Sequence, residues 1–164
     1  MSILHKLRQF NLPLEDMLNI YVLYIRSVLE QSAVVWNSSI TKGEQLDIER
    51  VQRCALRIIL GENYTSYQES LKVCNLVTLK ARRNQLSLKF AIKCTKNDKT
   101  KDIFPLNAKP ADTRYHEKYS VTRAKTDRLA NSAVPFMQRL LNKHEQQKKK
   151  WNVNILYIKS FICY

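Results

Sequence analysis

Glycine is nearly absent from this chain, and proline is scarce. Its 164 residues include two glycines, Gly43 and Gly61, which lie far apart. Loops that cradle phosphates or dinucleotides need several glycines close together, so this sequence excludes P-loop and Rossmann-type nucleotide sites. Prolines occur at only four positions: Pro13, Pro105, Pro110 and Pro135. Long stretches without a helix breaker favour helices over tight hairpins, and we expect an all-α protein.

The side-chain patterns that catalysis and metal binding require are also missing. The four cysteines form no CxxC pair and the three histidines stand alone, so no zinc spacing exists. The hydrolase, zinc-protease and deaminase motifs are absent, and no two aspartates are adjacent. The closest acidic pairs, Glu15 with Asp16 and Asp47 with Glu49, fall in the opening turns of expected helices, where acids complement the helix dipole. We therefore expect no catalytic residues, no metal and no cofactor.

No apolar run is long and clean enough to indicate a secretion signal or a spanning helix. The longest apolar stretches are interrupted by Asn19, Arg26 or Lys159. Unpatterned cysteines are typical of free, buried thiols in a reducing compartment. We expect an intracellular protein, nuclear or cytoplasmic, with no membrane partner.

Positive charge is abundant and rises along the chain. Lys and Arg number 28 against 14 Asp and Glu, which gives a net charge of +14. The net charge is +1 over residues 1–60, +5 over 61–112 and +8 over 113–164. Such an excess favours an anionic partner, and we predict binding to the backbone of RNA or DNA without sequence preference.

Four helices are predicted, at about 14–36, 41–60, 66–73 and 78–97. Thr41 and Glu44 form a capping box at the start of the second helix, which ends at Gly61. We expect a thumb-like helical domain over 1–97, built as a bundle of about four helices. An extended basic segment follows over 98–142 with a short helix at 134–142, and 143–164 is predicted to be a divergent, poorly ordered tail.

The predicted helix at 14–36 is apolar on nearly every face, which indicates burial by neighbours on several sides. Tyr24 and Trp36 are expected to fill its flanks. The alternative is an apolar surface that docks on another protein. Its expected central seam comprises Leu14, Leu18, Tyr21, Ile25, Val28 and Leu29.

Basic residues recur on one face of two predicted helices, opposite a stripe expected to be buried. The alternative is a solvated surface, with a Glu49–Arg53 pair on the second helix. Tyr115 and Tyr119 either stack on unpaired bases or, as is commoner for loop tyrosines, pack on the core. On the 78–97 helix the buried stripe is expected to be Leu79, Leu86, Phe90 and Cys94. The predicted nucleic-acid-binding residues are Arg50, Arg53, Arg57, Arg82, Lys89, Lys93, Lys96, Arg123 and Arg128.

Three strings in order resemble the carboxy-terminal region of non-LTR (LINE-like) retrotransposon reverse transcriptases. They are LRQFNLPLEDMLNIYVLYIRSVLEQSAVVWNSSIT, LDIERVQRCALRIILGENYTSYQESL and TDRLANSAVPFMQRLLN. Together with the helix at 78–97, they extend the resemblance over most of residues 4–142. Gln31, Ser32 and Cys54 depart from the family pattern, and the resemblance ends after Asn142.

The resemblance implies a thumb-like region that cradles the template and the nascent strand. Polymerisation in that family depends on metal-holding aspartates of the upstream palm, which this sequence lacks. We therefore expect a non-catalytic, nucleic-acid-binding fragment of an RNA-directed DNA polymerase. Two alternatives are a protein interaction module, which docks on a palm domain or another protein through the 14–36 helix, and a truncated retroelement product without function.

Overall fold

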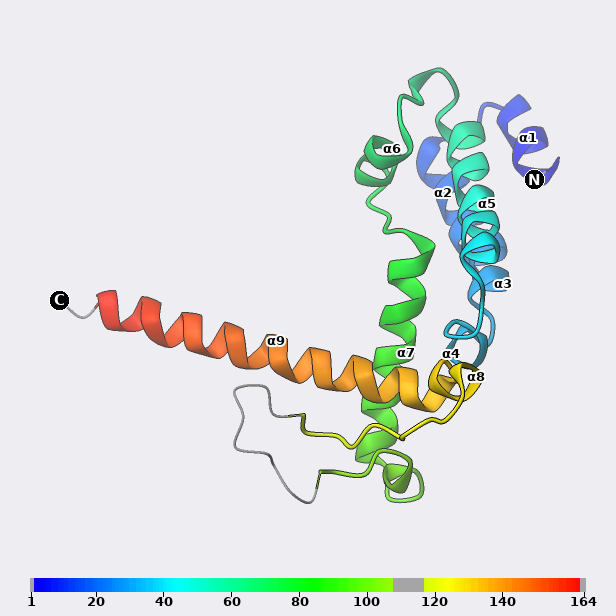
Figure 1. Ribbon diagram of the computed structural model, residues 1–164. Coiled ribbons are helices and arrows are strands. Elements are labelled where there is room, and N and C mark those ends of the chain that lie inside the picture. Colours follow the sequence, from blue (N-terminus) through cyan, green and yellow to red (C-terminus); the bar gives the residue numbers. More distant parts are fainter. Residues whose placement is uncertain (1, 108–116, 163–164) are drawn as a thin grey trace. The chain divides into compact units, whose positions relative to one another are not determined.

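The computed structural model describes residues 2–107 and 117–162, with side chains over 3–107 and 117–148. It divides into two compact units, Met1–Leu86 and Ser87–Tyr164, with the division inside helix α7 (Leu79–Lys96). The described ranges contain helices and no strand, apart from one isolated bridge between Leu106 and Tyr119 (Figure 1). The all-α prediction is confirmed, whereas the expected domain boundaries at 97 and 142 stay a prediction.

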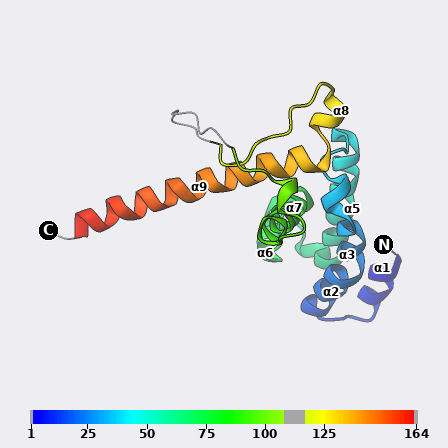
Figure 2. The ribbon, with the colours of Figure 1, turned by 90° about the horizontal axis from the view of Figure 1, so that it is seen from below.

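Unit 1 consists of helices joined by short turns. Both α1 and α2 lie beside the long helix α5, as Figures 1 and 2 show. The elements are α1 (Ser2–Gln9), α2 (Leu14–Ile20), the π-helix η1 (Tyr21–Arg26), α3 (Ser27–Glu30), α4 (Ala33–Trp36), α5 (Lys42–Leu60), the 3-10 helix η2 (Gly61–Asn63), α6 (Tyr67–Val73) and the first part of α7.

Helix α5 begins and ends where the sequence predicts. The Thr41 hydroxyl accepts a hydrogen bond from the Glu44 amide, and the Glu44 carboxylate accepts one from the Thr41 amide at 2.7 Å. At the other end Gly61 has φ +56°, which favours glycine. The Arg8 guanidinium of α1 packs over this glycine and donates to the carbonyl of Ile58 at 2.6 Å. Arg8 thus supplies a cation and a donor to the final turn of α5.

The predicted helix at 14–36 is divided in two ways. A π-helical stretch occupies Tyr21–Arg26, and Ser32 has φ +52° between α3 and α4. A π-turn contains an extra residue, so positions after it rotate away from the face that a 3.6-residue period assigns them.

Part of the expected seam is wrong, both before and after the π-helical stretch. Leu14 is 43% exposed and Val28 is 67% exposed, while Tyr24, expected on a packed flank, is 69% exposed. Tyr21 is buried as expected, and Met17, which was not expected in the seam, is buried beside it in the core of unit 1. That core comprises Leu4, Met17, Tyr21, Ala55, Ile58 and Ile59, with a second cluster of Leu56, Leu60, Leu71 and Cys74.

A buried amide, Gln52 of α5, connects this core to α6 and α7. Its Oε1 accepts from the Tyr21 hydroxyl at 2.9 Å, and its Nε2 donates to the Tyr67 hydroxyl at 3.2 Å and to the Val77 carbonyl at 3.0 Å. The Tyr67 hydroxyl donates in turn to Glu49, which also accepts from the backbone amide of Leu79. Four segments of unit 1 are thereby hydrogen-bonded through side chains of α5.

Unit 2 contains the end of α7, the 3-10 helix η3 (Lys101–Ile103), α8 (Asp127–Ala130) and α9 (Ala133–Ile162). The short helix predicted at 134–142 is the first part of α9, whose backbone continues to Ile162. The prediction that 143–164 is poorly ordered stays a prediction. The segment expected to be extended, 98–131, includes the short helices η3 and α8.

Two buried amides of α9 hold the extended chain against this helix. Asn142 accepts from the Tyr119 backbone amide and donates to the Tyr119 carbonyl, both at 2.9 Å. Gln138, one turn earlier, accepts from the Thr122 amide at 2.8 Å and donates to the Ile103 carbonyl at 3.2 Å. The segment before α8 accordingly runs beside the first half of α9 in both ribbon views (Figures 1 and 2).

Candidate nucleic-acid interface

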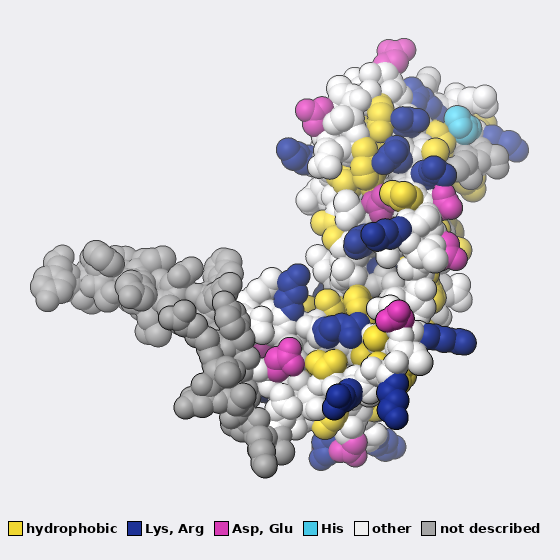
Figure 3. All heavy atoms as spheres, viewed as in Figure 1, with side chains coloured by type: hydrophobic (Ala, Val, Ile, Leu, Met, Phe, Trp, Pro, Cys, Tyr) yellow, Lys and Arg dark blue, Asp and Glu magenta, His cyan; other side chains and the backbone are white. Residues whose placement is uncertain are grey.

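The second half of α7 carries an exposed cationic stripe. Lys89, Lys93 and Lys96 recur at i, i+4 and i+7, which aligns them on one helix face. All three side chains are exposed, and none forms an ion pair with an acid among the described residues. Lys and Arg are also more numerous than Asp and Glu on the face drawn in Figure 3. We refer to Lys89, Lys93 and Lys96 as the α7 stripe.

An exposed aromatic ring lies at the edge of the α7 stripe. Phe90 was expected to be buried, but it is 46% exposed, and this prediction is wrong. Phe90 follows Lys89 directly and precedes Lys93 by three residues, so an apolar ring adjoins two ammonium groups. The position of Phe90 between Lys89 and Lys93 was a sequence signal for an exposed ring. The apolar spacing along the helix predicted burial instead.

Arg82 belongs to a different environment from the lysines that follow it. Its guanidinium Nε lies 3.2 Å from a carboxylate oxygen of Glu30, which is also paired with Arg26. The Arg82 side chain is 30% exposed. Because Arg82 shares the Glu30 carboxylate with Arg26, its charge is partly compensated and it is less free to meet an anion than an unpaired cation.

The three arginines predicted on α5 have three different surroundings. Arg50 is exposed and paired with Asp47 at 2.7 Å. Arg53 is half-buried with its guanidinium 5.2 Å from the Tyr67 ring centre, whereas exposed Arg57 lies 5.3 Å from the Tyr64 ring centre. Arg53 and Arg57 are both held against tyrosine rings. Of these two arginines, only Arg57 is exposed to solvent.

The ion pair expected between Glu49 and Arg53 is absent from the ion pairs of the described residues. The Glu49 carboxylate accepts from the Tyr67 hydroxyl and from the Leu79 amide instead. The alternative of a solvated α5 face is therefore wrong about the Glu49–Arg53 pair, because the Glu49 carboxylate is hydrogen-bonded to Tyr67 and Leu79.

A further arginine, Arg83, is buried completely, and no pattern in the sequence indicates this burial. Its Nε donates to the Asn37 side chain at 2.9 Å, and its guanidinium stacks on the Trp36 ring at 5.5 Å. Nη1 and Nη2 have no hydrogen-bond partner within the described residues, and burial lowers the pKa of this guanidinium below its ordinary value. This position cannot meet a polyanion without opening the surrounding structure.

The two arginines predicted in the basic segment are both exposed. Arg123 lies in the extended chain and Arg128 lies in α8. Tyr119 is 8% exposed and its backbone is fixed by Asn142, so open stacking of its ring on a base is excluded in this conformation. Tyr115 lies outside the described residues.

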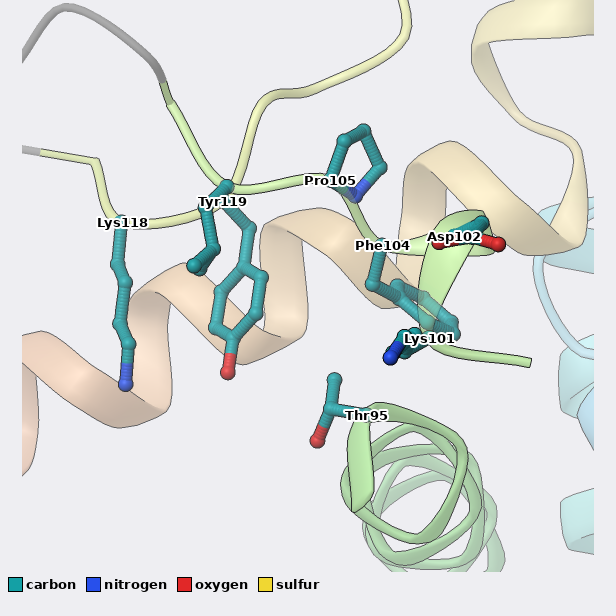
Figure 4. A pocket seen from close by; sticks show the side chains of 8 residues that line it. Thr95, Lys101, Asp102, Phe104, Pro105, Lys118 and Tyr119 are labelled. Atoms are coloured by element: carbon teal, nitrogen blue, oxygen red, sulfur yellow. The ribbon is translucent and has the colours of Figure 1, made fainter. Parts of the chain in front are cut away.

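A hollow of about 610 Å³ lies in unit 2 beside the end of α7 (Figure 4). Its two lysines are each paired with an acid: Lys101 with Asp98 at 3.0 Å, and Lys118 with Glu145 at 3.6 Å. We call it the Tyr119 hollow. It is lined by Thr95, Lys101, Asp102, Phe104, Pro105, Leu106, Lys118 and Tyr119.

No three His, Cys, Asp or Glu side chains in the described part lie close enough together to hold a metal ion. None of the helices found there combines the length and apolar character needed to cross a membrane. Comparison of the chain with protein-family models, curated proteins and solved structures finds no match.

Proposed function

We propose that this protein binds the backbone of RNA or DNA without sequence preference, and that it performs no catalysis of its own. The α7 stripe is the observation that carries this proposal. Its lysines are exposed and, over residues 3–107 and 117–148, have no acid partner of the kind that Arg50 and Arg82 have. Each phosphate that such a lysine neutralises releases a counterion, which makes binding salt-dependent.

The surrounding charge supports unit 2 as the main binding region. Residues 87–164 contain 17 Lys and Arg against 6 Asp and Glu, whereas residues 1–86 contain 11 against 8. Exposed Arg123 and Arg128 add to this excess, and the exposed ring of Phe90 offers a base a surface to stack on. Arg57 is the strongest supplementary contact in unit 1.

The proposal also concerns the protein family from which this chain derives. The three sequence strings resemble the region after the palm of a non-LTR retrotransposon reverse transcriptase, and a basic helical surface suits a thumb that cradles template and primer. We infer that residues 4–142 correspond to this region of such an RNA-directed DNA polymerase. A nuclear or cytoplasmic location follows from this proposal.

Replacement of Lys89, Lys93 and Lys96 by Gln tests the proposal. Binding of a fluorescent oligonucleotide is followed by anisotropy across a salt series, which gives the slope of log affinity against log salt. Loss of three phosphate contacts should reduce that slope by about 2 for a single strand. The matched control replaces three exposed lysines of unit 1 (Lys6, Lys72 and Lys80) by Gln, which removes the same net charge.

The control variant should keep a slope close to that of the wild type. Equal loss in both variants would mean that net charge acts without a defined surface. Absence of any wild-type binding at low salt would refute nucleic-acid binding altogether.

One observation favours a second function, docking on another protein. Leu23, Tyr24, Val28 and Val35 of the η1 to α4 region are each at least 65% exposed. Apolar side chains so open to water favour association. If they form a docking surface, Leu23→Ser with Val28→Ser should abolish self-association or partner binding and leave oligonucleotide affinity unchanged. Sedimentation velocity measures the first effect, and association that persists in high salt would distinguish it from nucleic-acid contacts.

A further inference from the structure

The Tyr119 hollow is nearly balanced in charge despite the basic surroundings. Asp98 and Glu145 compensate its lysines, and a third acid, Asp102, lies in the wall itself. A phosphate entering the hollow would have to displace these acids from the lysines and approach a carboxylate. The hollow therefore suits a neutral ligand better than an anion.

A hydroxyl without a partner is directed into this hollow. The Tyr119 side chain is 92% buried, since only 8% of its surface is exposed, and Figure 4 shows its oxygen directed into the space toward Thr95. No residue in the described part forms a hydrogen bond with that oxygen, which can both donate and accept. Because Asn142 fixes both backbone groups of Tyr119, the hydroxyl is held in position before any ligand arrives.

The remaining wall supplies apolar surface and one more polar group. Phe104 is buried, Leu106 is 62% exposed, and Pro105 lies between them. The Thr95 hydroxyl donates to the Ile92 carbonyl at 2.9 Å and keeps its capacity to accept. A flat ligand with apolar faces and a hydrogen-bonding edge matches this combination.

We infer that the Tyr119 hollow holds one unpaired nucleobase of a single strand whose phosphates lie on the α7 stripe. A nucleobase is neutral, planar and polar at its edge, and the volume of the hollow lies within the ordinary range of ligand sites. Thr95 connects the hollow to the α7 stripe, because it lines the hollow and directly precedes Lys96 on the same helix. This inference rests on the proposed function.

The hydrogen-bonding contribution of the Tyr119 hydroxyl sets the expected effect. The base edge exchanges a hydrogen bond with this hydroxyl, while the ring of Tyr119 remains part of the wall. Loss of that hydrogen bond should weaken binding of a base-containing strand by about threefold to tenfold. Binding of a strand without bases should not change, because its phosphates reach only the lysines.

The experiment compares a fluorescent oligothymidine with an abasic deoxyribose-phosphate strand of equal length. Affinities at low salt are measured for the wild type, for Tyr119→Phe and for Tyr24→Phe. The last is a matched control that removes a hydroxyl from an exposed tyrosine of unit 1. Circular dichroism confirms that each variant is folded, and Phe keeps the volume of the buried ring.

The expected result is tighter binding of oligothymidine than of the abasic strand, with the difference reduced in Tyr119→Phe and retained in Tyr24→Phe. Equal affinity of the wild type for both strands would overturn the nucleobase site and leave backbone binding intact. A base preference that survives in Tyr119→Phe would overturn it as well, and would assign the base to another surface such as Phe90. No binding of either strand would instead refute the proposed function itself.

Discussion

Replacement of Gln52 by Leu tests whether the buried amide connects the core of unit 1 to α6 and α7. Gln52 is fully buried and forms three hydrogen bonds. Leucine has a similar size but offers neither a donor nor an acceptor. The Tyr21 hydroxyl and the Val77 carbonyl would lose their partner, while the Tyr67 hydroxyl would keep its hydrogen bond to Glu49.

The expected cost follows from these two groups. A buried polar group left without a partner costs about 1–3 kcal/mol. The Tyr21 hydroxyl is buried whereas Val77 is 45% exposed, so the two groups together cost about 2–4 kcal/mol. The added apolar surface of leucine offsets about 1 kcal/mol. We expect the free energy of unfolding of unit 1 to fall by about 2 kcal/mol, a large part of the 5–15 kcal/mol that is typical of a domain.

Urea unfolding measures this change. Trp36 is half-buried in unit 1, and a Trp151→Phe background leaves it as the only tryptophan to report by fluorescence. Tyr21→Phe, alone and combined with Gln52→Leu, completes a double-mutant cycle. The combined variant should be more stable than the sum of the single losses by about 1–2 kcal/mol, because it removes both partners of one hydrogen bond.

A Gln52→Leu loss of less than about 0.5 kcal/mol, which is the size of an ordinary surface substitution, would show that the buried amide does not stabilise unit 1. An additive cycle would contradict the direct contact between Tyr21 and Gln52.

Two further predictions concern a glycine and a pair of tyrosines. Gly61→Ala should destabilise unit 1 by about 1–3 kcal/mol from backbone strain, and more in the presence of Arg8, whose guanidinium occupies the place of the new methyl group; urea unfolding with and without Arg8→Ala separates the two effects. Burial raises the pKa of Tyr21 and of Tyr67 above the ordinary value of about 10, and the hydrogen bond to Glu49 adds to the shift of Tyr67. The folded state therefore keeps phenol protons that the unfolded chain releases, so this stabilisation is complete below pH of about 10 and is lost as pH rises through the raised values. Urea midpoints near pH 8 and pH 11 should differ less in Tyr21→Phe than in the wild type, and an equal difference would argue against these shifts.

Local signals in the sequence predicted several helix boundaries correctly. The Thr41 and Glu44 capping box, the stop at Gly61 and the start near Thr78 depend on residues within a few positions of each boundary. Such features are formed by neighbours in the chain, so a reader of the sequence has all the information that determines them.

The buried polar residues could not be predicted from such local signals. Gln52 and Arg83 interrupt no apolar period, and each finds its hydrogen-bond partner more than thirty residues away, at Tyr21 and Asn37. The π-turn at Tyr21–Arg26 has no local sequence signal, and Val28, which follows it, is exposed where a 3.6-residue period predicts burial.

The candidate interface was predicted in part. Periodicity correctly predicted exposed cations at Lys89, Lys93 and Lys96. It could not show that Glu30 compensates Arg82, or that Phe90 turns toward solvent, because both facts depend on how the helices pack.

The side-chain amides of Asn142 and Gln138 form hydrogen bonds with the backbone of the extended segment, as a neighbouring β-strand would, although these side chains belong to a helix. The backbone N–H groups of Tyr119 and Thr122 consequently owe their protection to side chains of α9. In a hydrogen–deuterium exchange experiment these two amides should exchange together, at a rate governed by opening of the first turns of α9. Their exchange rate would therefore report how often the extended segment detaches from α9, to which the side-chain oxygen atoms of Asn142 and Gln138 attach it.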